Sequence, residues 1–467
     1  MDVQQVNSRV IHEQPDTVYR VVEPPISASH SNLAADAAQP ASGGGNSSGS
    51  DDVERQTTSS ASFEEPYPEG GWAAWSVVLG AFFALFSAMG LMNSIAVFQA
   101  YTLDHQLRGY SEGTVGWIFS IYTFLAFFGG VYFGPIFDKY GPRWLTICGA
   151  VCVTCSMLAM SFCTELWHFI LAFGVLGGLG TSLVFTPCIA AVGHWFKARR
   201  GFATGLATCA GGLGGIIFPL MLTDLFTRVG YGWATRALAL VCLVCGAVGV
   251  LLVRARLPPA QNATAHPDPR IFRQRPFALA TVAIFLLEFA LFIPLAYLST
   301  YALHHGFGAA YAYHLVPIMN AGSVVGRSLP GYYADAIGAF NTCLLSVVLS
   351  VVACLCVWLP LGHTSAGLIV FAVLFGFASG TGIAISPVCI GRMCKTQEYG
   401  RYYATTYTVV SFACLIGIPI AGSIVQANHG DYQQLIVFTG CVYVASAVFL
   451  VWAKAAQLGW GNWLAAY

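Results

Sequence analysis

The stretch GPIFDKYGPR, residues 134–143, decides the fold because its spacing recurs as GYYADAIGAF at residues 331–340. Each copy holds a glycine, an aspartate four residues later and another glycine three residues after that, and the copies are offset by 197 residues. Pro219 recurs as Pro419 at a similar offset of 200. Such repetition predicts that the chain is a tandem duplication of one structural unit.

Long apolar segments surround both copies. Of the 467 residues, 56% are hydrophobic and 9% are charged, whereas a soluble domain carries about 25% charged residues. We expect twelve segments long enough to cross a bilayer, at approximately 73–98, 113–133, 143–163, 167–190, 201–223, 233–253, 277–301, 311–333, 340–360, 366–388, 402–425 and 433–454. The sequence therefore predicts an all-α membrane protein with twelve transmembrane helices in two six-helix bundles. Parallel repeats of this kind enclose a site between the halves near the membrane midplane.

Composition sets the boundaries of these bundles. The first 66 residues include the run ASGGGNSSGSDD and lack an apolar signal-peptide core, which predicts a disordered cytoplasmic tail. The other expected parts are an N-terminal bundle at 67–256, a cytoplasmic central loop at 257–276, a C-terminal bundle at 277–457 and a short cytoplasmic tail at 458–467.

The distribution of lysine and arginine predicts the orientation. With the N-terminus inside, three basic residues lie on the outer side: Arg108, Arg228 and Arg236. Fourteen lie on the cytoplasmic side: Lys139, Arg143, Lys197, Arg199, Arg200, Arg254, Arg256, Arg270, Arg273, Arg275, Arg392, Lys395, Arg401 and Lys454. Cytoplasmic loops of membrane proteins carry such an excess. We therefore expect a multi-pass protein of the plasma membrane, embedded in the lipid bilayer, with both termini in the cytoplasm.

Several classes of function are disfavoured. The formal net charge of +0 argues against nucleic acid as a partner. Most of the fifteen cysteines lie inside apolar runs, and no CxxC pair has a His or Cys partner at zinc spacing, so we expect neither a metal nor a cofactor. The sequence contains no phosphate-binding loop of the GxxxxGK[ST] type, and GRMCKT near Gly391 lacks the second glycine. Transport driven by a gradient is expected, not an enzyme.

The loop at 134–143 resembles the signature loop of the major facilitator superfamily, and the copy at 331–338 strengthens the resemblance. It implies a conformational latch at the cytoplasmic helix ends. Glycines allow close backbone approach, and an aspartate beside a helix end can accept from orphan N–H groups and from an arginine. The candidate latch residues are Gly134, Asp138, Gly141, Arg143 and Asp335.

Two longer motifs give a narrower resemblance. EGGWAAW, residues 69–75, lies where the first helix begins, and HWFKARRGFATGLATCAGG, residues 194–212, spans the entry to the fifth. Both resemble signature motifs of the monocarboxylate transporter family, particularly its fungal branch. Read from the residues alone, Trp72 and Trp75 suit the membrane interface, and the basic run from Lys197 to Arg200 suits a cytoplasmic anchor.

Two charged residues lie deep inside predicted spans. Glu288 is near the middle of the seventh, in FLLEFALFIP, and Arg327 is in the eighth. A charge near the bilayer centre costs about 2.5 to 3.5 kcal/mol on insertion scales, and such residues face the bundle interior or a cavity. At 100° per residue, Asn320, Ser323 and Arg327 form one stripe of the eighth helix. We expect Glu288 and this stripe to line the substrate cavity.

The same family resemblance bears on Arg327. SVVGRSLPG, residues 323–331, resembles the segment in which an arginine at this position pairs with the substrate carboxylate in monocarboxylate transporters. Proton-coupled members carry an aspartate where this chain has Ser323 and a first-helix lysine where it has Asn93. The resemblance therefore implies an anion site at Arg327 without the usual proton-coupling pair, and Asn93 becomes a further candidate for substrate binding.

Glu288 is a candidate to replace that pair. Burial favours the neutral form of a carboxyl group, whereas a neighbouring arginine favours the ionised form. One hypothesis is that Glu288 and Arg327 exchange partners with an anionic substrate, and that Glu288 takes the proton when the pair opens. The alternatives are a fixed ion pair between the two helices, a bond to nearby hydroxyl groups, and contact with a substrate hydroxyl or amine.

The predicted function is secondary active transport of a small organic anion or carboxylated metabolite by alternating access. Efflux of a fungal secondary metabolite is favoured, because the arginine is kept while the coupling pair is lost. Phe285, Phe292 and Met319 are candidates to hold a bulkier apolar body. The alternatives are proton-coupled uptake of a monocarboxylate or vitamin-like nutrient, and a non-transporting sensor on the same fold.

Overall fold

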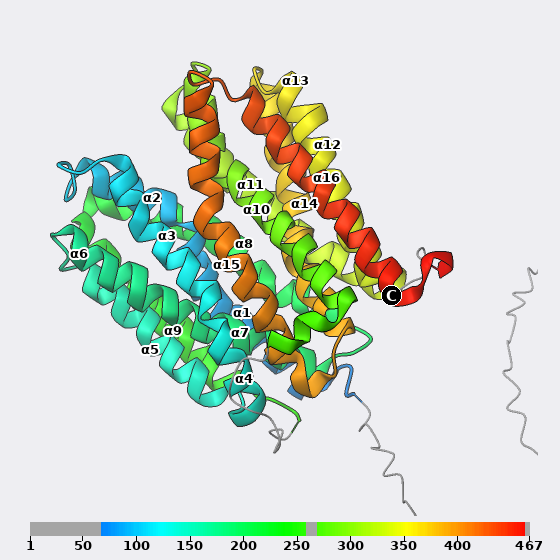
Figure 1. The fold of residues 1–467 in the computed structure, drawn as a ribbon. Coiled ribbons are helices and arrows are strands. Elements are labelled where there is room, and N and C mark those ends of the chain that lie inside the picture. Colours follow the sequence, from blue (N-terminus) through cyan, green and yellow to red (C-terminus); the bar gives the residue numbers. More distant parts are fainter. Residues whose placement is uncertain (1–66, 258–268, 463–467) are drawn as a thin grey trace, which may run out of the picture. The chain divides into compact units, whose positions relative to one another are not determined.

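The computed structural model describes residues 67–257 and 269–462, and these residues are helical with short connections (Figure 1). The predicted tail at 1–66, most of the predicted central loop and the last five residues lie outside the described part. The described residues belong to one contact unit. The part that the structure describes contains no β-strand.

The first half contains α1 (Gly71–Asn93), α2 (Ile95–Asp104), α3 (Glu112–Phe128), α4 (Gly130–Tyr140), α5 (Arg143–Met160), α6 (Leu166–Phe169), the π-helical η1 (Ile170–Gly177), α7 (Gly178–Trp195), α8 (Arg200–Arg228) and α9 (Gly230–Leu252). The predicted first span, 73–98, is broken at Ser94. The Ser94 hydroxyl donates 2.7 Å to the Gly90 carbonyl oxygen, a local bond that competes with regular helix geometry.

The second half contains the 3₁₀ turn η2 (Pro269–Arg273), α10 (Arg275–His304), α11 (Ala309–Ile337), α12 (Ala339–Val352), the π-helical η3 (Ala353–Trp358), α13 (Leu359–Leu361), α14 (Ser365–Arg392), η4 (Thr396–Glu398), α15 (Tyr399–Ala427), α16 (Gln433–Leu458) and η5 (Trp460–Asn462). Helix α10 begins two residues before the predicted span because Pro276 in its first turn fits a helix start, where the missing N–H has no intrahelical partner.

Eleven of the twelve predicted spans are long and apolar enough to cross a membrane in the described structure. The remaining one, α11, has 29 residues but is less apolar, because it carries Asn320, Ser323, Arg327 and Asp335. It packs against α8 on one side and α14 on the other. The least apolar helix therefore lies between the halves, where its polar side chains avoid lipid.

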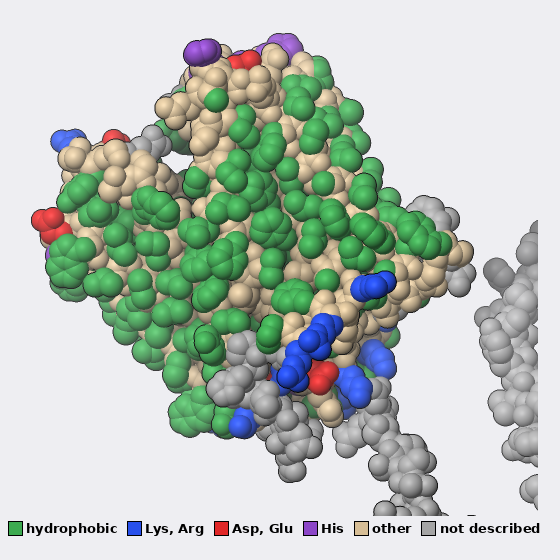
Figure 2. Space-filling view, viewed as in Figure 1, with side chains coloured by type: hydrophobic (Ala, Val, Ile, Leu, Met, Phe, Trp, Pro, Cys, Tyr) green, Lys and Arg blue, Asp and Glu red, His purple; other side chains and the backbone are tan. Residues whose placement is uncertain are grey.

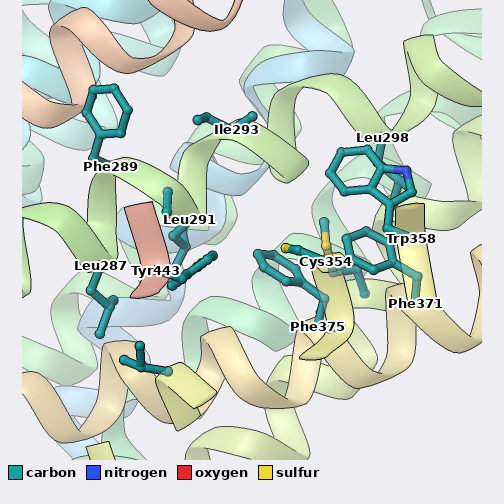
Figure 3. Packing of buried hydrophobic residues seen from close by; sticks show 14 of the residues in the cluster. Leu287, Phe289, Leu291, Ile293, Leu298, Cys354, Trp358, Phe371, Phe375 and Tyr443 are labelled. Atoms are coloured by element: carbon teal, nitrogen blue, oxygen red, sulfur yellow. The ribbon is translucent and has the colours of Figure 1, made fainter. Parts of the chain in front are cut away.

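Buried apolar side chains form the cores of the bundles. One cluster lies within residues 280–453 of the second half, and Figure 3 shows part of it, with the rings of Trp358 and Phe371 stacked at a centroid distance of 4.6 Å. A second cluster lies within residues 91–242 of the first half. A third joins residues of both halves, from Ala74 to Cys414. These cores hold the helices that surround the central cavity.

Glycines bring the two halves into contact along two helix pairs. In α4 against α15, a Cβ added to Gly400 would lie 2.9 Å from the Gly134 carbonyl oxygen. In α8 against α11, a Cβ added to Gly331 would lie 2.5 Å from the Gly201 carbonyl oxygen. Side chains at these positions would push the helices apart. The duplicated sequence thus gives two matching contacts between the halves.

The surface separates into an apolar flank and a basic end. Figure 2 shows hydrophobic side chains over the flank and Lys and Arg side chains at the lower end. We call this the basic end; it holds Arg143, Arg254, Arg256, Arg273 and Lys395 among others. At the opposite end the surface in Figure 2 is notched between the halves. The apolar flank suits a bilayer, and the chain is a multi-pass membrane protein.

Candidate functional site: a cavity between the halves

A cavity lies between the two halves, and all five residues predicted to bind substrate line it. Its empty volume is about 540 Å³, including space open to solvent. The first half contributes Met89, Met92, Asn93, Phe127 and Phe185. The second half contributes Glu288, Leu291, Phe292, Leu295, Met319, Asn320, Ser323, Arg327, Ser379, Ile383 and Tyr407. The structure therefore brings the predicted residues together, while their roles in binding stay predictions.

Arg327 is buried in the cavity wall and is held by two hydrogen bonds. Its Nε donates 3.1 Å to Ser323 Oγ, one turn earlier in α11, and its Nη1 donates 2.7 Å to the Thr208 carbonyl oxygen of α8. Gly211 makes room for it, because a Cβ there would lie 2.6 Å from Nη1. A guanidinium has five N–H donors, so three are left for a ligand.

Glu288 is buried on the facing helix α10, with 3% of its surface exposed. Within the described residues its carboxyl group has no hydrogen bond and no ion pair, although Arg327 acts on it electrostatically. The alternative of a fixed ion pair with Arg327 is therefore not what this structure shows. A buried charge without a partner is costly, so a proton or a ligand must supply the missing interaction.

Asn93 and Asn320 hold α1 and α11 against the glycine-rich face of α8. The Asn93 amide donates 2.9 Å to the Gly211 carbonyl oxygen, and the Asn320 amide donates 3.1 Å to that of Gly215. A Cβ on Gly215 would lie 2.8 Å from the Asn320 amide nitrogen. Both asparagines line the cavity, and both also fix its wall.

The rest of the wall is apolar or aromatic, apart from the hydroxyl groups of Ser379 and Tyr407. The Tyr407 hydroxyl is buried and forms no hydrogen bond of normal geometry with a described residue, although the Tyr403 ring lies beside it. Phe292 and Met319 line the cavity as predicted. The prediction for Phe285 is wrong: it packs on the core of the second half, 6.2 Å from the Phe289 ring. These two side chains are one helical turn apart and share that face.

Asp138 and Asp335 cap helices of the opposite half at the basic end. Asp138, on α4, accepts from the backbone N–H groups of Gly400 and Arg401, at 3.0 and 2.8 Å. Asp335, on α11, accepts from those of Gly201 and Phe202, at 2.8 and 3.0 Å. Each carboxylate satisfies orphan N–H groups in the first turn of a long helix, α15 or α8, and complements its dipole. We call these contacts the two aspartate caps.

The other predicted latch residues lie around the first cap. Gly134 is in close contact with α15, and Gly141 ends α4 with a φ of 80° that favours glycine. Arg143 donates no hydrogen bond to Asp138; its side chain is exposed. The arginine that acts on Asp138 is Arg401 of the other half. The latch role of all these residues stays a prediction.

A buried arginine forms a further contact between the halves that the sequence did not indicate. Arg200 belongs to the basic run that was predicted as a cytoplasmic anchor, and 3% of its surface is exposed. Its Nη2 donates 2.9 Å to the Gly193 carbonyl oxygen near the end of α7, and its Nη1 donates 3.0 Å to that of Gly391 near the end of α14. A cation is favourable at helix C-termini. These contacts had no signal in the sequence, because the partners of Arg200 are backbone carbonyl oxygens and not a nearby carboxylate.

Glu69, in the first of the two long motifs, caps the turn that leads into α8. Its carboxylate accepts from the backbone N–H groups of Lys197, Ala198 and Arg199, at 2.8, 2.7 and 3.0 Å. Partial burial raises the pKa of Glu69, but these three bonds and the nearby Arg200 outweigh it, so the pKa is lowered. The two motifs, at residues 69–75 and 194–212, thus form one structural unit.

Two repeated helical halves, joined at one end and separated by a central cavity, define the class of secondary transporters built from duplicated bundles. The sequence model of the Major Facilitator Superfamily matches residues 77–366 and 331–460. The chain belongs to this superfamily, and it is a transporter and not an enzyme.

Relatives with assigned cargoes extend this finding. The chain is 36% identical over 394 residues to the aspyridones efflux protein of Emericella nidulans, covering 84% of this chain and 79% of the relative. It is 33% identical over 419 residues to the riboflavin transporter of Saccharomyces cerevisiae, covering 85% and 80%. Among solved structures, the transporter FucP in the outward conformation aligns with a TM-score of 0.64 at 16% identity, over 81% of this chain and 98% of that one. That likeness concerns the fold alone.

Proposed function

We propose that the chain exports an organic anion, in particular a carboxylated fungal secondary metabolite, across the plasma membrane. The observation that carries this proposal is Arg327, a buried guanidinium anchored by Ser323 and Thr208 with donors left over in a cavity between the halves. A guanidinium matches a carboxylate through two parallel hydrogen bonds. A buried cation with free donors favours an anionic cargo over a neutral one.

The apolar wall supports a cargo larger than a simple monocarboxylate. Opposite Arg327, the first half presents Met89, Met92, Phe127 and Phe185. Methionine side chains adapt to ligands of different shape, and aromatic rings bury large apolar areas. A cargo with a carboxylate at one end and an apolar body at the other matches the chemistry of both parts of this wall. One relative is named as an efflux protein for aspyridones, and this name supports export of a metabolite.

The basic end supports the mechanism. The two aspartate caps and the Arg200 contacts join the halves there, and the notch lies at the opposite end. With the basic end in the cytoplasm, the structure corresponds to a state closed toward the cytoplasm. Rocking of the halves would break the caps and expose the cavity to the cytoplasm, where an exported anion enters.

Comparison of metabolites tests export directly. Cells with and without the gene are grown alike, and organic anions are measured in the medium and in cell extracts. Export predicts that at least one acidic metabolite falls in the medium and rises in the cells when the gene is removed. An anion that instead disappears from the cells and stays in the medium would show uptake and contradict the proposal.

Proton-coupled uptake of a vitamin-like nutrient is the second candidate, and Glu288 is the observation that favours it. This carboxyl group faces the cavity without a fixed partner, as a proton carrier requires. The relative named as a riboflavin transporter supports it as well. Supplying riboflavin to cells with and without the gene tests this candidate: gene-dependent accumulation supports uptake, and equal accumulation counts against riboflavin as the cargo.

A further inference from the structure

A second cavity lies at the basic end, outside the substrate site. Its empty volume is about 1420 Å³, including space open to solvent. Three arginines line it: Arg143 from the start of α5, and Arg254 and Arg256 from the segment after α9. Among the lining residues that the structure describes, the single acidic side chain is Asp138, and both of its oxygens accept hydrogen bonds from α15. The cavity therefore carries an excess of positive charge.

The N-terminus of α5 adds to this positive potential. Gly141, Pro142 and Arg143 line the cavity at that end of the 18-residue helix. The N-cap residue, Pro142, gives no side-chain hydrogen bond to the first turn. The orphan N–H groups and the helix dipole therefore favour an anion there.

His194 provides an independent indication of a ligand. Its side chain lines the cavity with 4% of its surface exposed, and it packs against the Phe137 ring at 5.3 Å. One ring nitrogen has the Thr396 backbone as its hydrogen-bonding neighbour, and the other has no hydrogen-bond partner among the described residues. Buried polar groups are seldom left unpaired, so a hydrogen-bonding ligand would satisfy this imidazole.

The wall beside these charges is apolar and reaches the surface. Ile147, Val250 and Leu251 line the cavity. Leu251 is 78% exposed, and Trp144, next to Arg143, is 71% exposed. In a membrane protein such exposed apolar side chains face lipid. The cavity thus opens from a basic interior toward the lipid tails, which is the arrangement that an anionic lipid requires.

We propose that this cavity binds a phosphate group, held by Arg143, Arg254, Arg256 and His194 and carried by an anionic phospholipid or by free phosphate. The apolar wall favours the lipid as the source. The site also lies beside the contact between the halves, because it is lined by Asp138 of the first half and by Gln397 of the second half. Arg143, Arg254, Arg256 and His194 all belong to the first half, and a phosphate that they hold lies beside Gln397 of the second half.

Titration calorimetry on the purified full-length protein in phosphatidylcholine nanodiscs tests the site. The probes are dioctanoyl phosphatidic acid and, separately, inorganic phosphate. The variants are Arg254→Gln and Arg256→Gln, with Arg273→Gln as the matched control, because Arg273 is an exposed arginine of the same end that does not line the cavity. We expect each of the two variants to weaken binding about fivefold, as removal of one surface arginine does, and the control to bind as the original chain does.

The outcomes separate the sources of the phosphate. Binding of phosphatidic acid alone, weakened in both variants, supports a lipid site. Binding of both probes, weakened in parallel, supports a site that also takes free phosphate. Equal affinities for the two variants and the control, or no saturable binding of either probe, would overturn the proposal. Thermal unfolding of each variant confirms that it is folded, and His194→Gln serves as a second variant if an arginine variant is not.

Discussion

At the scale of single residues, Arg327 and Glu288 are the two charged side chains that line the cavity among the described residues. Arg327 has anchors on both α11 and α8, while Glu288 has none. The sequence placed both charges inside the membrane and on cavity faces, because charged side chains avoid lipid. It did not indicate that the Thr208 carbonyl anchors Arg327, because a backbone carbonyl has no sequence signature.

Replacing Arg327 by lysine tests the anion site. Arg327→Lys keeps the charge but loses the Nε bond to Ser323 and the planar pair of donors, so we expect transport at low substrate concentration to fall by about tenfold or more. The measurement is the initial rate of efflux of the anion that the metabolite comparison identifies. Arg228→Lys, at an exposed pair with Asp224, is the matched control. A rate for Arg327→Lys equal to that of the control would rule out direct pairing with the cargo.

Replacing Glu288 by glutamine tests proton coupling. Glu288→Gln keeps the shape and removes the titratable group, so a proton carrier at this position predicts a rate that no longer changes with pH between about 5 and 8. The measurement is the transport rate of the original chain and of the variant across that range, with Asp104→Asn, an exposed carboxylate, as control. Normal rates with unchanged pH dependence would contradict the proton role and leave Glu288 as a contact for the cargo.

At the scale of elements, the duplicated ends of α4 and α11 form the two aspartate caps. The repeated aspartates predicted a cap at each copy, and the structure shows Asp138 and Asp335 capping α15 and α8. The sequence could not indicate which helices they cap, because the partners are backbone N–H groups about 130 to 260 residues away. The contacts of Arg200 could not be predicted for the same reason, since its partners are carbonyl oxygens of α7 and α14.

Removing one aspartate cap should loosen the helix that it caps. Loss of a side-chain cap costs about 1 kcal/mol, so in Asp138→Ala we expect the Gly400 and Arg401 amides to exchange hydrogen about fivefold faster. Hydrogen exchange followed by mass spectrometry measures this. Asp224→Ala, at the opposite end of α8, is the control, and unchanged exchange at the start of α15 in Asp138→Ala would argue against the cap.

The Glu69 contact predicts a dependence of stability on pH. The pKa of Glu69 in the folded chain is lowered from its ordinary value of 4.5, so its carboxylate stabilises the fold above pH 4.5. This contribution is lost as the pH falls through the lowered pKa. Glu69→Gln should therefore lower the Tm at pH 7, and the difference in Tm from the original chain should shrink below pH 4.5. Glu398→Gln is the control, and a difference that stays constant with pH would contradict this role.

At the scale of the whole molecule, the two caps bear on one motion. If the halves rock as units, both caps break together, and their contributions to the closed state add. Removal of one cap costs about 1 kcal/mol, so it raises the equilibrium constant for opening about fivefold. The double variant, Asp138→Ala with Asp335→Ala, then raises this constant about 25-fold. The measurement is hydrogen exchange at the starts of both α8 and α15. Faster exchange at the mutated site alone, with the other cap unaffected, would show local fraying and contradict rigid rocking.

The duplication also explains which features of the fold could be predicted from the sequence. The repeat at 134–143 and 331–340 predicted two bundles and their cavity, because the periodicity of apolar segments fixes membrane helices. The π-helical segments η1 and η3, the break at Ser94 and the second cavity were not predicted. The second cavity depends on contacts between segments that are distant in sequence, which no local pattern of residues encodes.

Arg327 carries a consequence for the order of events in transport. It belongs to the second half by its backbone and to the first half by its bond to the Thr208 carbonyl. Separation of α8 from α11 at this depth therefore breaks a charge-assisted bond in a medium of low dielectric constant. An anion that takes over the freed donor lowers the barrier to separation, so an empty carrier turns over more slowly than a loaded one. We therefore expect the cargo to speed the conformational change that carries it across the membrane.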